Sequence, residues 1–136
     1  MPATPSSEIF ERGLRILAQG DLDGWLRLCA EDAVFEFPFA PEGRPGRIVG
    51  RAALRDYMRA YPGQVASPSI SSLLVHSTSD PEVIVVEMAL RGIHRASNTV
   101  RESLFIAVVT IKDGLITGYR DYWNPNGARP ISDQAA

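Results

Sequence analysis

Asp121 is the residue whose type and surroundings best suit acid–base chemistry, because it stands between Tyr119 and Trp123 near the end of an apolar segment. In a regular strand over residues 115–123, these three side chains share one face. Burial on that face would raise the pKa of the carboxyl group and favour proton donation near neutral pH. The alternative is an outward-facing aspartate that pairs with a neighbouring charge or caps a turn. We predict that Asp121 is a general acid or base.

The aromatic residues of the chain predict the walls of a ligand site. Tyr57 and Tyr61 lie one turn apart on a predicted helix, where they would face a cavity and donate hydrogen bonds. A tyrosine is a poor base at pH 7, and the alternative is a pair of core residues with hydroxyls at the rim. An apolar cavity with few polar groups suits a flat aromatic or polyketide-like molecule. The predicted substrate-binding residues are Trp25, Phe37, Tyr57, Tyr61, Phe105, Tyr119 and Trp123.

The two histidines and the single cysteine do not predict a metal site. His76 and His94 lie near the ends of predicted strands, where histidine is more often a surface residue than a catalyst. Two histidines without carboxylates at matching spacing do not make a zinc site. Cys29 excludes an intramolecular disulfide and falls at a predicted buried helix position, which is typical of a small apolar residue. We therefore expect no metal and no cofactor.

Charged residues in two neighbouring predicted strands indicate an ionic cluster. Glu87 and Arg91 lie on one strand face, and Arg101 or Glu102 of the next strand would complete the cluster. The alternative is that Arg91 binds a carboxylate of the substrate.

The charge balance argues against nucleic acid as a partner. The 136 residues carry a formal net charge of −2, and Asp56 interrupts the arginines between residues 44 and 59. A solvated helix face explains that arginine cluster. The first residues lack the basic and apolar regions of a signal peptide, and no apolar run is long enough to cross a bilayer. We therefore expect a cytoplasmic protein with no membrane or nucleic-acid partner.

The first part of the chain predicts three helices that would position these residues. Apolar residues at helical spacing indicate a first helix with Thr4 or Ser6 as its cap. Asp21 is the expected cap of a short second helix. The apolar stripe of the first helix consists of Ile9, Phe10, Leu14 and Leu17, and the other two helices are expected at about Leu22–Ala30 and Arg51–Tyr61.

The later part of the chain changes to the two-residue period of strands. Before the third helix, residues 38–49 hold three prolines and two glycines and predict a loop of the kind that often borders a binding site. Short turns between the later strands predict an antiparallel sheet, and helices followed by strands indicate the α+β class. The expected strands span Ala33–Phe37, Val65–Ser77, Val83–His94, Thr99–Ile111 and Leu115–Trp123.

Both faces of the predicted strand at 99–111 are apolar. Phe105 and Ala107 point to one face, whereas Leu104 and Ile106 point to the other. Both faces should be covered, but three helices can cover only one. The second face is therefore predicted to be a subunit interface, most simply in a two-fold dimer. The alternative is a twisted sheet that folds over itself.

Three short motifs occur in order, QGDLDG at 19–24, AEDAV at 30–34 and GRAAL at 50–54. Their order and spacing resemble the nuclear transport factor 2-like superfamily, in its SnoaL-like and ketosteroid-isomerase-like branch. The C-terminal half is similar to phenazine-biosynthesis A/B proteins at DP (80–81), VE (86–87), RG (91–92), RE (101–102) and RDYWNP (120–125). The resemblance spans about residues 8–125 and implies a cone-shaped, usually dimeric fold. A strongly curved antiparallel sheet would wrap around three N-terminal helices and enclose an apolar pocket, in a single domain over 1–136 with flexible tails at 1–7 and 126–136.

The sequence also departs from the families that it resembles. Ketosteroid isomerases use an aspartate base, a tyrosine and a protonated aspartate, and the matching positions hold Phe37, Gly13 and Ala107. Steroid isomerisation by that mechanism is therefore not expected. The phenazine-type proteins resemble this sequence in having an acid, a glutamate, at the position of Asp121. They differ from it in having a histidine where Tyr57 stands. The resemblance implies an acid at Asp121 and does not imply the phenazine condensation.

Two hypotheses for the function follow. The first is a cofactor-free enzyme of secondary metabolism, an isomerase, cyclase or condensation aid that uses Asp121 for general acid–base catalysis on an apolar, aromatic or polyketide-like substrate. The second is a non-catalytic ligand-binding or scaffold protein with a vestigial pocket, which the three vacant acid–base positions favour. We place the enzyme first.

Overall fold

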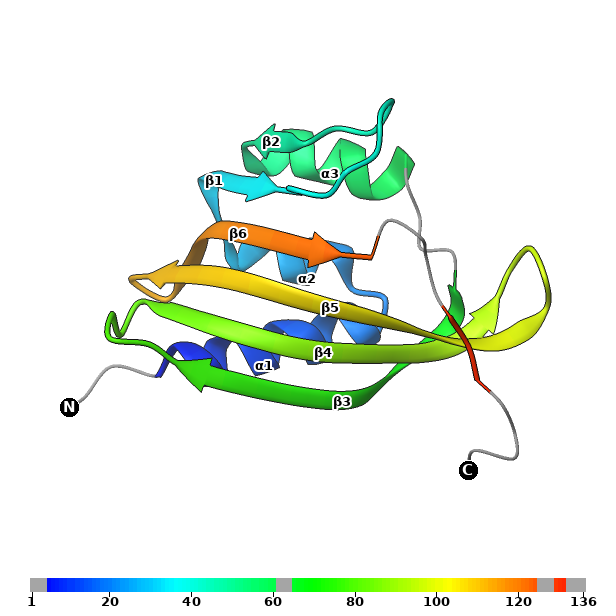
Figure 1. Ribbon diagram of the computed structural model, residues 1–136. Helices are drawn as coiled ribbons and strands as arrows, with labels where there is room; N and C mark the ends of the chain where they lie inside the picture. Colours follow the sequence, from blue (N-terminus) through cyan, green and yellow to red (C-terminus); the bar gives the residue numbers. More distant parts are fainter. Residues whose placement is uncertain (1–4, 61–64, 125–128, 132–136) are drawn as a thin grey trace.

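Among the residues that the structure describes, three helices and seven strands build the fold, and two of the helices precede every strand (Figure 1). The computed structural model describes residues 5–60, 65–124 and 129–131. The helices are α1 (Ser6–Ala18), α2 (Leu22–Arg27) and α3 (Arg51–Ala60). The strands are β1 (Cys29–Glu36), β2 (Arg47–Val49), β3 (Val65–Ser77), β4 (Val83–His94), β5 (Thr99–Lys112), β6 (Leu115–Trp123) and β7 (Arg129–Pro130).

All seven strands join one sheet in the order β2-β1-β6-β5-β4-β3, and β7 pairs with β5. Strands β3 to β6 form the antiparallel meander that the sequence predicts. By contrast, β1 lies parallel to β6, and its register shifts between Cys29 and Val34. Parallel neighbours need a long connection, and the chain from β2 through β5 supplies it here.

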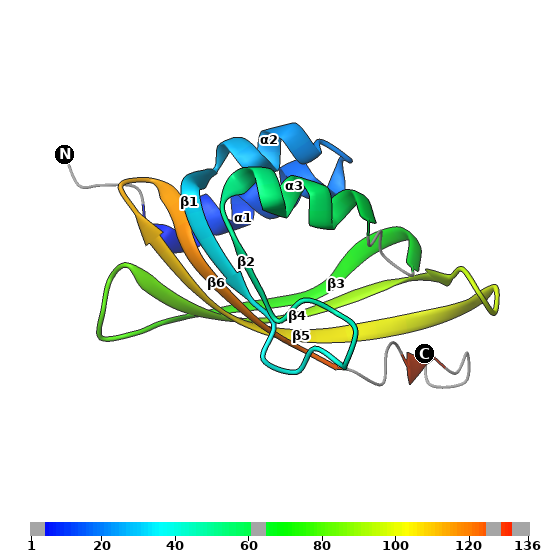
Figure 2. The same ribbon diagram turned by 90° about the horizontal axis from the view of Figure 1, so that it is seen from above.

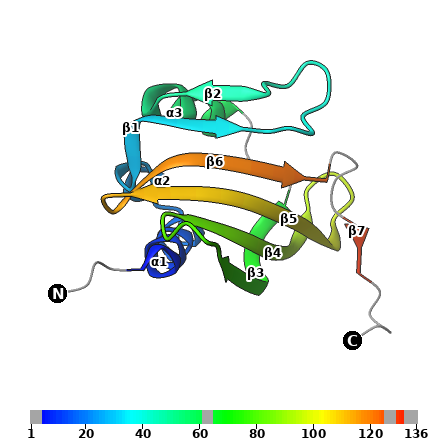
Figure 3. The same ribbon diagram turned by 60° about the vertical axis from the view of Figure 1, so that its left-hand side comes forward.

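The three helices cover one face of the sheet, and the long strands bend past them (Figures 2 and 3). This curved, unclosed sheet is the predicted cone of the α+β class. On the face toward the helices, the inner face, Ala107 and Val109 of β5 are 1% and 0% exposed. On the outer face, Leu104 and Ile106 of the same strand are 47% and 46% exposed. No helix of the described residues covers the outer face.

The helix caps follow the predictions in part. The Asp21 carboxylate accepts a hydrogen bond from the Gly24 amide at 2.8 Å and caps α2, as predicted. The prediction of Ser6 as the cap of α1 is wrong, because Ser6 is the first helical residue and its hydroxyl donates to the Pro81 carbonyl at 3.0 Å. Thr4 lies outside the described residues.

Several boundaries differ from the predicted ones. The second helix ends at Arg27 rather than near Ala30, and Cys29 is buried at the start of β1, where it pairs with Ile116. The predicted loop at 38–49 contains the short strand β2, which pairs with β1. Helix α1 starts at Ser6 and β7 pairs with β5, so parts of both expected tails belong to elements. The differences at Cys29, β2 and β7 come from pairing between distant segments, which local periodicity does not report.

Candidate functional site

Asp121 lies on the inner face of β6, two residues from Tyr119 and two from Trp123. Its register partner on β5 is Ala107, a core residue of the inner face. Because side chains alternate along a strand, Tyr119, Asp121 and Trp123 all project toward the face that the helices cover. Strand geometry therefore aligns an acid and two aromatic residues in one row.

The carboxyl group of Asp121 is desolvated. Its Oδ1 atom is buried and has no hydrogen-bond partner. Burial raises the pKa of Asp121 from 3.8 to about 7, because the charged form loses its hydration. A carboxyl group that titrates near pH 7 can both give and accept a proton at neutral pH.

Tyr119 is enclosed by other aromatic rings. Phe35 stacks on it with centroids 5.1 Å apart, and the rings of Phe10 and Trp25 each lie 6.3 Å from it. Burial raises the pKa of Tyr119 far above its ordinary value, and the neighbouring charge of Asp121 raises it further. Tyr119 therefore stays protonated and forms a wall beside Asp121 rather than a base.

A second cluster lies where the loop after β1 returns to the sheet. Phe37 stacks on Tyr57 of α3 with centroids 5.1 Å apart. Arg44 Nη2 lies 3.5 Å from the Tyr57 hydroxyl, and the guanidinium carbon of Arg44 lies 5.5 Å from the centroid of the Trp123 ring. Trp123 thus connects this cluster to Asp121. Arg44 lies in the predicted loop at 38–49, but its position in the sequence gives no sign of the contact with Trp123.

The other predicted wall residues are placed as follows. Trp25 and Phe37 are core residues, 4% and 8% exposed. Phe105 packs against the core and lies opposite Trp123 in the register of β5 and β6. Tyr61 lies outside the described residues.

Packing fills the three positions at which the resemblance to ketosteroid isomerases implies acid–base groups, Gly13, Phe37 and Ala107. A Cβ atom on Gly13 would lie 2.9 Å from the Trp25 ring, so a larger side chain at this position requires that ring to move. Ala107 is a core residue of the inner face, and Phe37 is engaged in its stack with Tyr57. None of the three residues is an acid or a base.

The charged candidates outside this region form polar interactions with one another or with their own turn. His76 Nε2 lies 2.6 Å from Glu87 Oε2, and both side chains are about half exposed. Arg91 Nε donates to Glu102 Oε2 at 3.0 Å, as the predicted ionic cluster requires. The expectation that Glu87 joins this cluster is wrong, because Glu87 pairs with His76 instead. His94 bonds to a serine in its own turn.

Cys29 behaves as an apolar residue, since burial raises the pKa of its thiol from 9.0 to about 11. Among residues 5–60, 65–124 and 129–131, no group of three His, Cys, Asp or Glu side chains is placed to share a metal ion. None of the helices in these same ranges is long and apolar enough to traverse a bilayer.

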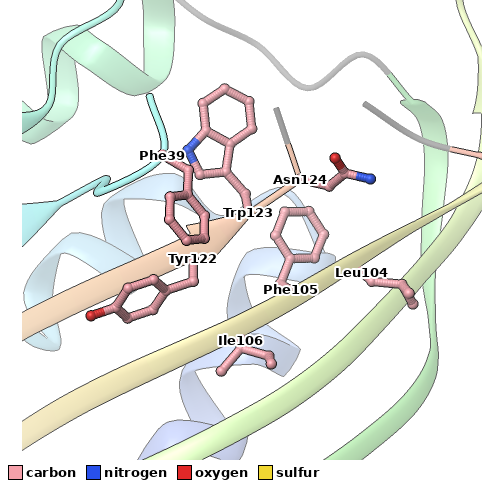
Figure 4. A pocket seen from close by; sticks show the side chains of 7 residues that line it. All are labelled: Phe39, Leu104, Phe105, Ile106, Tyr122, Trp123 and Asn124. Carbon is pink, nitrogen blue, oxygen red and sulfur yellow. The ribbon is translucent and has the colours of Figure 1, made fainter. Parts of the chain in front are cut away.

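A shallow apolar depression of about 290 Å³ lies where the middle of β5 meets the end of β6, and it includes Leu104 and Ile106 of the outer face (Figure 4). The rings of Phe39 and Tyr122 meet there edge to face, with centroids 5.6 Å apart. Trp123 borders this depression and also contacts Arg44, so it belongs both to the depression and to the cluster of Phe37, Tyr57 and Arg44. The lining residues are Phe39, Leu104, Phe105, Ile106, Tyr122, Trp123 and Asn124.

Comparison with known proteins places the chain in a family. A family model described as the SnoaL-like domain matches residues 10–119. The chain therefore belongs to the SnoaL-like family, within the nuclear transport factor 2-like superfamily. It is 36% identical over 118 residues to the uncharacterised protein YesE of Bacillus subtilis, covering 87% of this chain and 80% of that protein. It is 33% identical over 120 residues to an uncharacterised PhzA/B-like protein of Pseudomonas aeruginosa, covering 88% and 84%.

Solved structures show the same fold. A structure from Bacillus subtilis, described as that of a proposed isomerase, superposes with a TM-score of 0.80 at 35% identity and covers 89% of this chain and 87% of its own. The Δ5-3-ketosteroid isomerase of a Mycobacterium species superposes with a TM-score of 0.75 at 24% identity, covering 95% and 100%. A Mycobacterium tuberculosis protein in complex with estradiol-17β-hemisuccinate superposes with a TM-score of 0.75 at 21% identity. The match covers 93% of this chain and 99% of that one. At these lower identities the likeness concerns the fold alone.

Proposed function

We propose that this protein is a cofactor-free enzyme that uses Asp121 as a general acid or base on an apolar, aromatic or polyketide-like substrate. The observation that carries the proposal is the buried, unpartnered Oδ1 of Asp121 with a carboxyl pKa of about 7. Such a group exchanges protons at neutral pH, which is the requirement for an isomerase, a cyclase or a condensation aid. Perturbed carboxyl groups of this kind gather at functional sites.

The surroundings of Asp121 support the apolar substrate. Tyr119 and Trp123 flank the acid on its own strand, and Phe37 and Tyr57 form a stacked pair that Arg44 links to Trp123. Flat rings lined up beside one acid suit a flat, largely apolar molecule. Solved structures that share the fold include one described as a proposed polyketide cyclase and one as a ketosteroid isomerase.

A second candidate function is ligand binding without chemistry. It is favoured by the three positions that lack an acid–base group, above all Gly13, where the Trp25 ring takes the space that a side chain would need. In this case Asp121 would be a vestigial acid in a binding or scaffold protein.

The substitution Asp121→Asn separates the two functions. A thermal-shift screen of aromatic acids, polyketides and steroids, with mass spectrometry of any ligand retained through purification, identifies a substrate. The enzyme proposal expects the variant to lose at least about 100-fold in turnover, with ligand affinity and fold nearly unchanged. Equal turnover in the variant and the parent protein would rule out Asp121 as the catalytic acid and favour the binding function.

We further propose that the protein acts in the cytoplasm as a homodimer. The outer face presents apolar side chains to solvent, with Leu74 55%, Leu104 47% and Ile106 46% exposed. Exposed apolar side chains on one sheet face are typical of an assembly surface, and a two-fold axis would cover them with a second copy of the same face.

A further inference from the structure

Two tryptophan N–H groups are buried without an acceptor. The Nε1 atoms of Trp25 and Trp123 are both inaccessible and have no hydrogen-bond partner. Indole Nε1–H is a donor only, and buried polar groups in folded proteins are nearly always paired. Neither N–H has a partner among the described residues, so an oxygen atom of a bound ligand could accept a hydrogen bond from either one.

Both donors lie beside Asp121. Trp123 follows Asp121 by two residues on the inner face of β6. The ring of Trp25 lies edge-on to that of Tyr119 at 6.3 Å, and Tyr119 precedes Asp121 by two residues on the same face. Trp25 therefore lies at the Tyr119 end of the row of Tyr119, Asp121 and Trp123, and Trp123 forms its other end.

The Trp123 end also carries positive charge. The guanidinium carbon of Arg44 lies 5.5 Å from the centroid of the Trp123 ring, and guanidinium groups only donate hydrogen bonds. The Tyr57 hydroxyl lies 3.5 Å from the same guanidinium. An anion at this end would meet a cation and an indole N–H, whereas an ammonium group would meet repulsion.

We infer that the substrate is a flat aromatic or polyketide-like carboxylate, whose carboxylate lies at the Trp123 and Arg44 end and whose reacting carbon faces Asp121. An oxygen acceptor toward the other end would satisfy Trp25. The inference rests on the proposed function, because it assumes that the ligand lies along the Asp121 row. It distinguishes this site from one built for a neutral steroid or for an amine. Charge-assisted hydrogen bonds of this kind are stronger than neutral ones and fix orientation.

Matched naphthalene compounds test the inference by isothermal titration calorimetry. The probes are 2-naphthoate, 2-methylnaphthalene and 2-naphthylmethylamine, which share a ring system and differ in charge. We expect 2-naphthoate to bind at least about tenfold more tightly than the amine. In Trp123→Phe, which keeps a ring and removes the N–H, and in Arg44→Met, 2-naphthoate should lose about fivefold or more in affinity, with little change for 2-methylnaphthalene.

Arg47→Met is the matched control, because Arg47 is an exposed arginine of β2, just after the same loop, and its loss should leave all three affinities unchanged. Binding of the amine as tightly as the acid would overturn the inference, and so would equal losses for 2-naphthoate and 2-methylnaphthalene in Trp123→Phe. Neither result affects the role of Asp121. Failure of all three probes to bind would instead contradict the apolar ligand site, and with it both the proposed function and this inference.

Discussion

The ring of Phe37 stacks on the ring of Tyr57, with centroids 5.1 Å apart and an angle of 25° between the planes. This contact joins the residue after β1 to α3, at the position where the resemblance to ketosteroid isomerases implies a catalytic base. Neither ring is a carboxylate base. The proposed acid–base chemistry therefore rests on Asp121 of β6.

Truncation of the stack should destabilise the fold. Phe37 is 8% exposed, so Phe37→Ala should lower the free energy of unfolding by about 3 kcal/mol, because it removes buried area and leaves a cavity. In a double-mutant cycle with Tyr57→Ala, the two rings should show a coupling energy of about 1 kcal/mol. Urea denaturation measures both quantities, and additive losses would show that the stack contributes nothing of its own.

Asp121 should make stability fall as the pH rises. The folded-state pKa of about 7 exceeds the ordinary value of 3.8, so the folded protein holds a proton that the unfolded chain releases between these two values. The stabilisation is complete below pH 4 and is lost as the pH passes through 7. Between pH 5 and pH 8, the parent protein should lose on the order of 2 kcal/mol more than Asp121→Asn.

The other titrating groups are the same in the parent protein and in Asp121→Asn, so their contributions to the pH dependence of stability cancel in the comparison. Urea denaturation at both pH values gives the difference. If the two proteins keep a constant difference in stability from pH 5 to pH 8, the Asp121 carboxyl group has an ordinary pKa in the folded state.

Arg51 should anchor α3 to the sheet. Its Nη2 and Nε atoms donate to the Cys29 carbonyl at 2.6 and 3.2 Å. Arg51→Met should therefore cost about 2 kcal/mol of unfolding free energy, since it removes a charge-assisted bond to a buried backbone group. Arg55→Met is the control on the same helix, because Arg55 pairs with Asp23 at the surface and should contribute under about 1 kcal/mol. Equal losses would contradict the anchoring role.

Charge on the outer face should dissociate the proposed dimer. Ile106→Glu and Leu104→Glu change residues that are about half exposed in the single chain, so the monomer fold should tolerate them. We expect the parent protein to sediment as a dimer and both variants as monomers in analytical ultracentrifugation. Val49→Glu, at an equally exposed apolar residue of β2, should remain dimeric. A monomeric parent protein would contradict the proposed interface.

The long strands could be predicted from the sequence because their signals are local. The alternation from Val83 to His94 and the turn residues at 112–114 are enough to fix β4 and the β5–β6 hairpin. The same alternation placed Asp121 between Tyr119 and Trp123 on one face. The curvature of the sheet was predicted from the resemblance to the family, because no local sequence pattern indicates it.

Features that depend on contacts between distant segments could not be predicted. Cys29 has the periodicity of a helix but pairs with Ile116 in the sheet. Arg44 stands in a loop rich in proline and glycine, and only the fold brings it to Trp123. The pairing of Glu87 with His76 likewise depends on the register of β3 and β4. This register places Val86 opposite Val75 on the inner face, so Glu87 lies on the outer face, where it reaches His76.

The central claim is that the fold holds the side chain of Asp121 away from water on the inner face of β6. A titration of its carboxyl carbon by ¹³C NMR, assigned by its absence in Asp121→Asn, measures this most directly. We predict a midpoint at about pH 7, in line with the raised pKa. A midpoint near pH 4 would mean that the carboxylate is hydrated, and would contradict the proposed acid–base role.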